Sequence, residues 1–147
     1  MIFDRTELFS SAQAVTATTA STNVIDTGAT GTVYGASMPL VRDLGKGTPI
    51  PLRINVRSSF NNLTGFQVSY QVADDAAFTA NLTTVITSPV YTLAQMQAGA
   101  AHILPDVAPI GANRRYHRLL YTVTGTAPTT GTIDAGFTAG NQTNQVL

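Results

Sequence analysis

The sequence predicts an all-β fold: an antiparallel β-sandwich or jelly roll with one short helix and extended terminal arms. Several runs alternate apolar and polar residues with the period of two that is typical of strands with one buried face. Clusters of Gly, Pro, Asp and Asn separate these runs at the short spacing found in two-sheet domains. A chain of 147 residues is long enough for one core. We therefore expect a single domain over residues 1–147.

The clearest strands are expected at residues 51–57, 65–72, 116–125 and 132–138. In each of them the apolar side chains occupy alternate positions and share one face. One side of each strand therefore faces the core and the other faces solvent, as in antiparallel sheets. The predicted core positions are Leu52, Ile54, Val56, Phe66, Val68, Tyr70, Val72, His117, Leu119, Tyr121, Val123, Ile133, Ala135 and Phe137.

The helix and the arms are predicted from local signals. Thr92 and Gln95 have the spacing of a capping box, and Gly99 supplies a stop for a short helix. Residues 1–12 and 139–147 are polar terminal segments, which a domain's own core seldom holds. We expect them to form an N-terminal arm and a C-terminal tail.

Composition excludes several classes of function. Only 11% of residues are charged, against about 25% in an average soluble domain, which fits either a Thr-rich β surface or a surface covered by partners. The net charge of zero argues against wrapping nucleic acid. Cysteine is absent, so disulfides and thiolate metal sites are excluded. The uncharged stretch at 8–25 is too rich in Ser and Thr for a membrane, and the start of the chain lacks the pattern of a signal peptide. We expect a soluble protein made in a cytoplasm.

The stretch "LVRDLGKGTPIPLRINVR", residues 40–57, raises the possibility of a phosphate-binding loop. Such a loop requires a helix after its Gly-Lys-Ser/Thr, because the helix N-terminus holds the anion. Here Gly47, Thr48 and Pro49 lead into a strand instead. We interpret the stretch as a turn before an edge of the sheet, with Arg53 and Arg57 on the outer face of that strand.

No catalytic or metal site is predicted. His102 and His117 are the only imidazoles, and arginines surround His117, so both are interpreted as structural or surface residues. No Gly-x-Ser-x-Gly elbow occurs, and the adjacent Asp74 and Asp75 resemble turn residues. A glycosidase pair built from distant carboxylates such as Asp26 and Asp134 remains open. We expect no enzyme activity, no cofactor and no small-molecule substrate.

The cluster "RRYHR" concentrates basic and aromatic residues, namely Arg114, Arg115, Tyr116 and Arg118. Arginine and tyrosine together can grip single-stranded nucleic acid, but they are also the residues enriched in protein-interface hot spots. The neutral net charge favours the protein interface. A solvated strand edge that discourages aggregation remains an alternative.

Four stretches in the same order resemble the capsid cement (decoration) proteins of Bordetella-phage type. They are "FSSAQAVTATTASTNVIDTG", "RDLGKGTPIPLRINV", "VADDAAF" and "YHRLLYTVTGTAPTTGTIDAGF", which together extend from Phe9 to Phe137. The resemblance implies a jelly roll without enzyme activity that forms a homotrimer on the outer surface of a virion and locks the major capsid protein in place. Residues 29–41 look like an insertion and the C-terminal tail like an addition, so the family's detailed contacts are not transferred.

The resemblance also gives a role to the apolar residues of the N-terminal arm. We expect residues 1–12 to cross to another subunit or to the shell, where Phe3, Leu8 and Phe9 would be covered. Together with the exposed arginines they complete the predicted interface: Phe3, Leu8, Phe9, Arg53, Arg57, Arg114, Arg115, Tyr116 and Arg118. The alternative function is a carbohydrate-binding β-sandwich module, for example of a phage tail or fibre, although the chain has no Trp.

Overall fold

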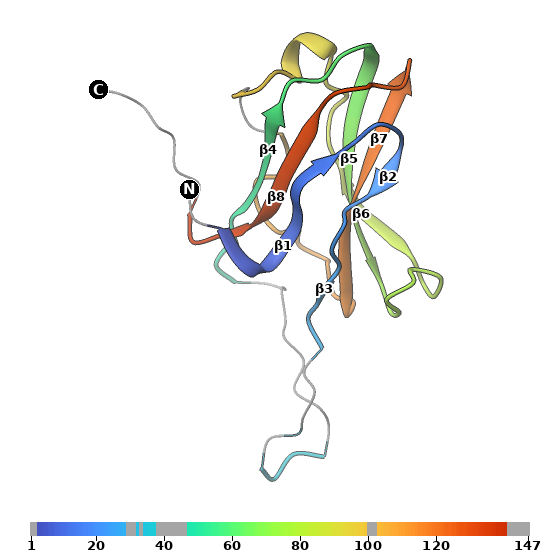
Figure 1. Ribbon diagram of the computed structural model, residues 1–147. Coiled ribbons are helices and arrows are strands. Elements are labelled where there is room, and N and C mark those ends of the chain that lie inside the picture. The colour runs from blue at the N-terminus through green and yellow to red at the C-terminus, as the bar shows by residue number, and fades with distance from the viewer. Residues whose placement is uncertain (1–2, 29–31, 33, 38–46, 100–102, 141–147) are drawn as a thin grey trace, which may run out of the picture.

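A computed structural model describes residues 3–28, 32, 34–37, 47–99 and 103–140. It confirms the predicted all-β sandwich, with two antiparallel sheets packed face to face (Figure 1). Sheet A has the order β1 (Phe3–Ala14), β8 (Thr132–Thr138) and β4 (Leu52–Ser58). Sheet B has β7 (Tyr116–Gly125), β5 (Leu63–Ala73) and β6 (Thr83–Thr87) in that order, and the short strands β2 (Thr19–Ala20) and β3 (Ile25–Asp26) both pair with the outer side of β7. In the described ranges no helix is long and apolar enough to cross a bilayer.

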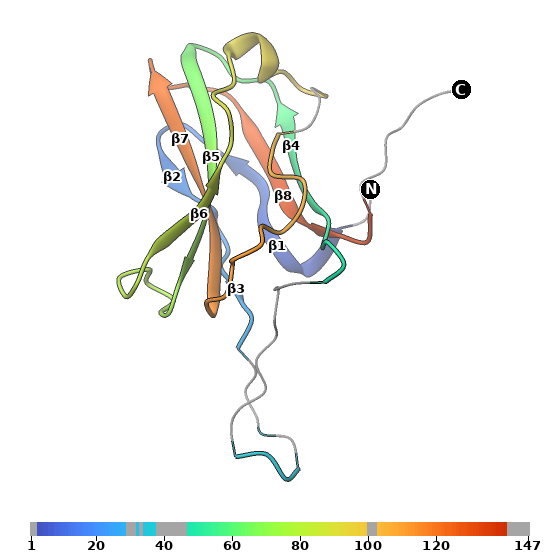
Figure 2. The same cartoon turned by 180° about the vertical axis from the view of Figure 1, so that it is seen from behind.

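The strands pair as one long folded-back hairpin, which is the topology of a jelly roll. β1 pairs with β8, β2 and β3 pair with β7, and β5 pairs with β6. Between them in the sequence, the start of β4 pairs with residues 106–108 through a bridge between Pro51 and Val107. Successive pairs alternate between the two sheets. Figure 2 shows the segment before β7 (orange) returning past β4 on the far side of the molecule.

The predicted core positions are confirmed, except that Val123 is only partly buried. The strand β5 differs from the predicted alternation, because its polar residues Ser69 and Gln71 are buried as well. Side chains of the flanking strands cover them. The Ser69 hydroxyl lies 3.1 Å from that of Thr87, and the Gln71 amide contacts Thr84 at 3.2 Å.

The prediction of a free N-terminal arm over residues 1–12 is wrong from Phe3 onward, because these residues form β1 in sheet A. Phe9 is fully buried, with its ring edge-to-face on Tyr70 and on Phe137 at centroid distances of 5.8 and 5.4 Å. The pairing of β1 with β8 has repeated register shifts, and Ala12 has a φ of 48°. These irregularities break the period of two, so the pattern of a strand is absent from the sequence. The predicted tail lies outside the described residues from 141 onward.

The predicted helix is present but consists of one 3₁₀ turn, η1 (Leu93–Gln95). The backbone N–H of Thr92 donates to the side chain of Gln95 at 2.9 Å, which is half of the capping box. The helix ends at once because Met96 is buried and its carbonyl accepts a bond from the N–H of Phe60 at 3.0 Å. Gly99 follows with a φ of 75°, a conformation that favours glycine.

Candidate interaction surfaces

The arginines before β7 are paired within the domain. The guanidinium of Arg114 donates to both carboxylate oxygens of Asp74 at 2.7 Å, and Arg115 donates to Asp26 at 2.7 and 2.8 Å. These bidentate pairs tie the start of β7 to the β5–β6 loop and to β3. Solvent still reaches 30% of the Arg114 side chain and 45% of that of Arg115. The cluster therefore has partners within its own domain and surface left exposed, and its role as an interface stays a prediction.

Arg118 and Tyr116 continue this arrangement on the outer face of sheet B. The guanidinium of Arg118 stacks 4.1 Å from the ring centre of Phe78, and its Nε donates to Gln71 at 2.9 Å. Burial lowers the pKa of Arg118. Arg115 lies 5.0 Å above the ring of Tyr116. These stacked arginines cover part of the outer face of sheet B.

The "VADDAAF" stretch forms a closed loop between β5 and β6, which confirms the interpretation of Asp74 and Asp75 as turn residues. The Asp75 carboxylate accepts bonds from the N–H groups of Thr79 and Ala80 at 2.9 and 2.8 Å. These bonds lower its pKa, and bonds from Asn81 and Arg114 lower that of Asp74. Phe78 is buried with a φ of 58°, so a non-glycine residue adopts a left-handed conformation beneath Arg118.

His117 is a buried structural residue. Its Nδ1 lies 3.0 Å from the hydroxyl of Tyr70, and its Nε2 lies 3.4 Å from the hydroxyl of Thr27. Burial lowers the pKa of His117 to about 4, so the ring is neutral near pH 7. His102 lies outside the described residues. The described part of the chain contains no group of three His, Cys, Asp or Glu side chains close enough to hold a metal.

The carboxylates that remained open as a catalytic pair belong to different sheets. Asp26 is in β3 and is bound by Arg115, whereas Asp134 is in β8 and contacts Arg57 at 3.6 Å. The amide of Ala12 also donates to Asp134. In the described part of the chain, each of these two carboxylates therefore binds groups of its own sheet.

The remaining predicted interface residues divide into three groups. Arg53 and Arg57 lie on the outer face of β4, where Arg53 donates to Asn55 at 2.7 Å and the Arg57 side chain is 61% exposed. Phe3 and Leu8 are partly exposed in β1. Phe9 is completely buried in the core, so no other molecule can reach it in the folded domain, and its assignment to the interface is wrong.

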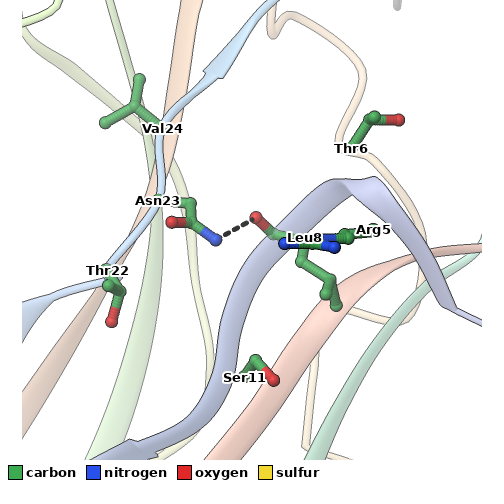
Figure 3. A pocket seen from close by; sticks show the side chains of 7 residues that line it. All are labelled: Arg5, Thr6, Leu8, Ser11, Thr22, Asn23 and Val24. Carbon is green, nitrogen blue, oxygen red and sulfur yellow. Dashed lines mark hydrogen bonds between the residues drawn. The ribbon is translucent and has the colours of Figure 1, made fainter.

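A polar groove lies beside β1, and it was not predicted from the sequence because its residues come from separate segments. Its lining comprises Arg5, Thr6, Leu8, Ser11, Thr22, Asn23 and Val24, around a volume of about 890 Å³ (Figure 3). The amide of Asn23 donates to the carbonyl of Leu8 at 3.1 Å and holds the two walls together. Among the described residues of the lining Arg5 alone is charged, and the other polar side chains carry hydroxyls and one amide.

An apolar groove of about 360 Å³ lies between β6 and the segment that pairs with β4. Its lining comprises Gly47, Thr48, Pro49, Ile50, Val85, Ile86, Val107, Ala108, Pro109 and Ile110. Ile86 and Ile110 are 42% and 77% exposed, which is unusual for large aliphatic side chains that lie together. One feature of the sequence could have indicated a wall of this groove: the run from 76 to 105, which includes Val85 and Ile86, contains no Asp, Glu, Lys or Arg.

A family model named Bbp16 matches residues 9–137 of this chain. The chain belongs to the Bbp16 family. The matched range begins within β1 and ends within β8, so it includes parts of both sheets and the whole lining of the apolar groove, but not Arg5, Thr6 and Leu8 of the polar groove. No curated protein matches the chain.

Proposed function

We propose that this member of the Bbp16 family is a capsid cement protein of a tailed bacteriophage, which binds the outer surface of the shell of major capsid protein as a homotrimer. One observation carries the proposal: the family match and the resemblance to cement proteins of Bordetella-phage type cover the same residues, 9–137. This range contains residues of every strand of both sheets. The resemblance therefore concerns the folded domain and not a single hairpin.

Binding is the mechanism that such a role requires. A copy that contacts several subunits of the shell opposes their separation, and each further contact forms at the high effective concentration that the first contact creates. A stiff sandwich loses little conformational freedom when it binds, so more of the contact energy is retained. The stacked arginines, the closed β5–β6 loop and the exposed Arg57 fit this requirement.

Co-sedimentation of the full chain with purified shells of the major capsid protein tests the proposal. We expect the chain to pellet with the shells and to raise the temperature at which they come apart. Light scattering of the free chain should give the mass of three copies. A chain that stays in the supernatant would overturn the cement function, whereas a different mass would overturn only the trimer.

The polar groove supports a second candidate, a carbohydrate-binding module. Hydroxyl, amide and guanidinium groups of Thr6, Ser11, Asn23 and Arg5 line it, and these groups can bond to sugar hydroxyls. A glycan array distinguishes the candidates. Binding of a glycan that Arg5→Ala abolishes, by a chain that ignores shells, would favour this second function.

A further inference from the structure

Tyr34 is the most exposed large apolar residue in the described part of the chain, with a relative exposure of 107%. It belongs to residues 34–37, which lie beyond the end of the sandwich and away from both sheets (cyan in Figures 1 and 2). Gly35 follows it with a φ of 81° in a turn. A tyrosine ring with this exposure is a typical anchor for a contact with another molecule.

The apolar groove has the properties of a receptor for such a ring. Its volume of about 360 Å³ lies in the range of pockets that hold small ligands, roughly 300–1,000 Å³. Ile86 and Ile110 expose aliphatic surface on this groove, and among the described residues of its lining Thr48 alone has a polar side chain. A tyrosine needs this combination, because its ring is apolar and its hydroxyl requires one hydrogen-bonding partner. Tyr34 of the same copy does not line the groove.

We propose that Tyr34 of one copy inserts into the apolar groove of a second copy of this chain. Tyr34 and the groove are different surfaces of the molecule, so the contact is head-to-tail, and repetition of a head-to-tail contact closes a ring when the rotation between copies allows it. A ring of three would account for the homotrimer of the proposed function. The contact does not depend on binding to a shell.

The distribution of charge favours a second copy as the occupant. No charged residue occurs among the ten that line the groove, and none occurs from 27 to 41, the stretch that carries Tyr34. Identical chains that meet through these surfaces therefore bury no ionised side chain there and bring no like charges together. Head-to-tail association of a neutral chain also has no long-range repulsion to overcome.

Light scattering of the full chain over a range of concentrations tests the contact, with Tyr34→Ser and Ile110→Ser as the variants. We expect each to weaken association at least about tenfold, as removal of an interface anchor does. Tyr34→Phe should keep most of the association. Val90→Ser is the matched control, because Val90 is 60% exposed but lies outside the groove. Thermal unfolding of every variant shows that the domain remains folded.

A double variant tests whether the two surfaces meet directly. Tyr34→Lys and Ile110→Glu should each prevent association, and the two together in one chain should restore it, because each lysine then faces a glutamate of the next copy. A wild-type chain that is monomeric at all concentrations would overturn the contact, as would a double variant that stays monomeric. Monomeric variants that still pellet with shells would leave the cement function standing without the trimer. Association by a wild-type chain that ignores shells would preserve the contact and remove the cement function.

Discussion

The hydroxyl of Ser10 lies 2.7 Å from the hydroxyl of Tyr121 in the interior of the sandwich. Ser10 belongs to β1 of sheet A and Tyr121 to β7 of sheet B, so this bond joins the two layers. Both residues are fully buried, and Ser10 also donates to Gln13 at 2.6 Å. Burial raises the pKa of the Tyr121 hydroxyl, which therefore stays protonated and able to donate.

Loss of either hydroxyl should destabilise the domain, but unequally. Ser10→Ala leaves the Tyr121 hydroxyl buried without a partner among the described residues, and we expect a loss of roughly 1–3 kcal/mol in the free energy of unfolding. Tyr121→Phe removes the donor while Ser10 keeps its bond to Gln13, so a smaller loss of about 1 kcal/mol is expected. Urea unfolding measures both. Ser58→Ala is the control, because Ser58 makes a similar bond to Thr132 at 2.8 Å on the exposed surface. Equal effects at all three sites would contradict the role of the buried bond.

Gly131 should be intolerant of any side chain. A Cβ placed there would lie 2.3 Å from the ring of Phe60, and the φ of Gly131 is 128°, where other residues are strained. Phe60 is buried against Phe66, so its ring cannot easily move away. We expect Gly131→Ala to lower the free energy of unfolding by roughly 3 kcal/mol, measured by thermal or urea unfolding. Gly140→Ala is the matched control, because nothing lies within 4 Å of its Cβ position. A stable Gly131→Ala variant would show that the connection between β7 and β8 can shift.

The sequence was sufficient for the parts of the fold that keep a regular period. Strand β4, most of β7 and the first half of β8 alternate, so their buried faces could be predicted residue by residue. In β1 the register shifts and the left-handed Ala12 remove that period, so Phe9 was assigned to an extended N-terminal arm although it is a core residue. The short helix was predicted from its cap, but its length depends on the contact between Phe60 and Met96, which is distant in sequence.

The surfaces were harder to predict than the core. The cluster at 114–118 was visible as a group of arginines, but its partners Asp26 and Asp74 lie far away in the sequence, so their ion pairs could not be foreseen. Both grooves combine segments from separate parts of the chain. The uncharged run from 76 to 105 contains Val85 and Ile86 of the apolar groove, but it was not predicted to form a surface. Tertiary proximity, and not local pattern, creates these surfaces.

The exposed arginines should contribute more to binding than to folding. Arg114 and Arg115 are partly exposed, and exposed ion pairs stabilise proteins by less than about 1 kcal/mol. We therefore expect Arg114→Ala and Arg115→Ala to leave thermal unfolding almost unchanged while they weaken co-sedimentation with shells. Arg5→Ala is a control cation on another face, in the polar groove. Undiminished shell binding by both variants would remove this cluster from the interface.

The neutral, buried ring of His117 should make the stability of the domain depend on pH in a defined window. The pKa of His117 is about 4 in the folded state, against 6.5 for an unperturbed histidine, so the unfolded chain binds the proton more tightly. The free energy of unfolding should therefore fall as the pH decreases from about 6.5 to about 4, by roughly 3 kcal/mol in total. Urea unfolding between pH 7 and pH 4 measures this slope.

A substitution separates this effect from those of the carboxylates. Asp4, Asp74 and Asp75 have pKa values below their ordinary value of 3.8, so the stability that they contribute is present above that pH and is lost only below it. His117→Gln replaces the ring with a group that does not titrate and can still bond to Tyr70 or Thr27. The variant should be less stable at pH 7 and nearly independent of pH from 4 to 6.5. If the free energy of unfolding of the variant changes with pH as steeply as that of the wild type, another group causes the pH dependence. His117 would then be accessible to water in the folded domain.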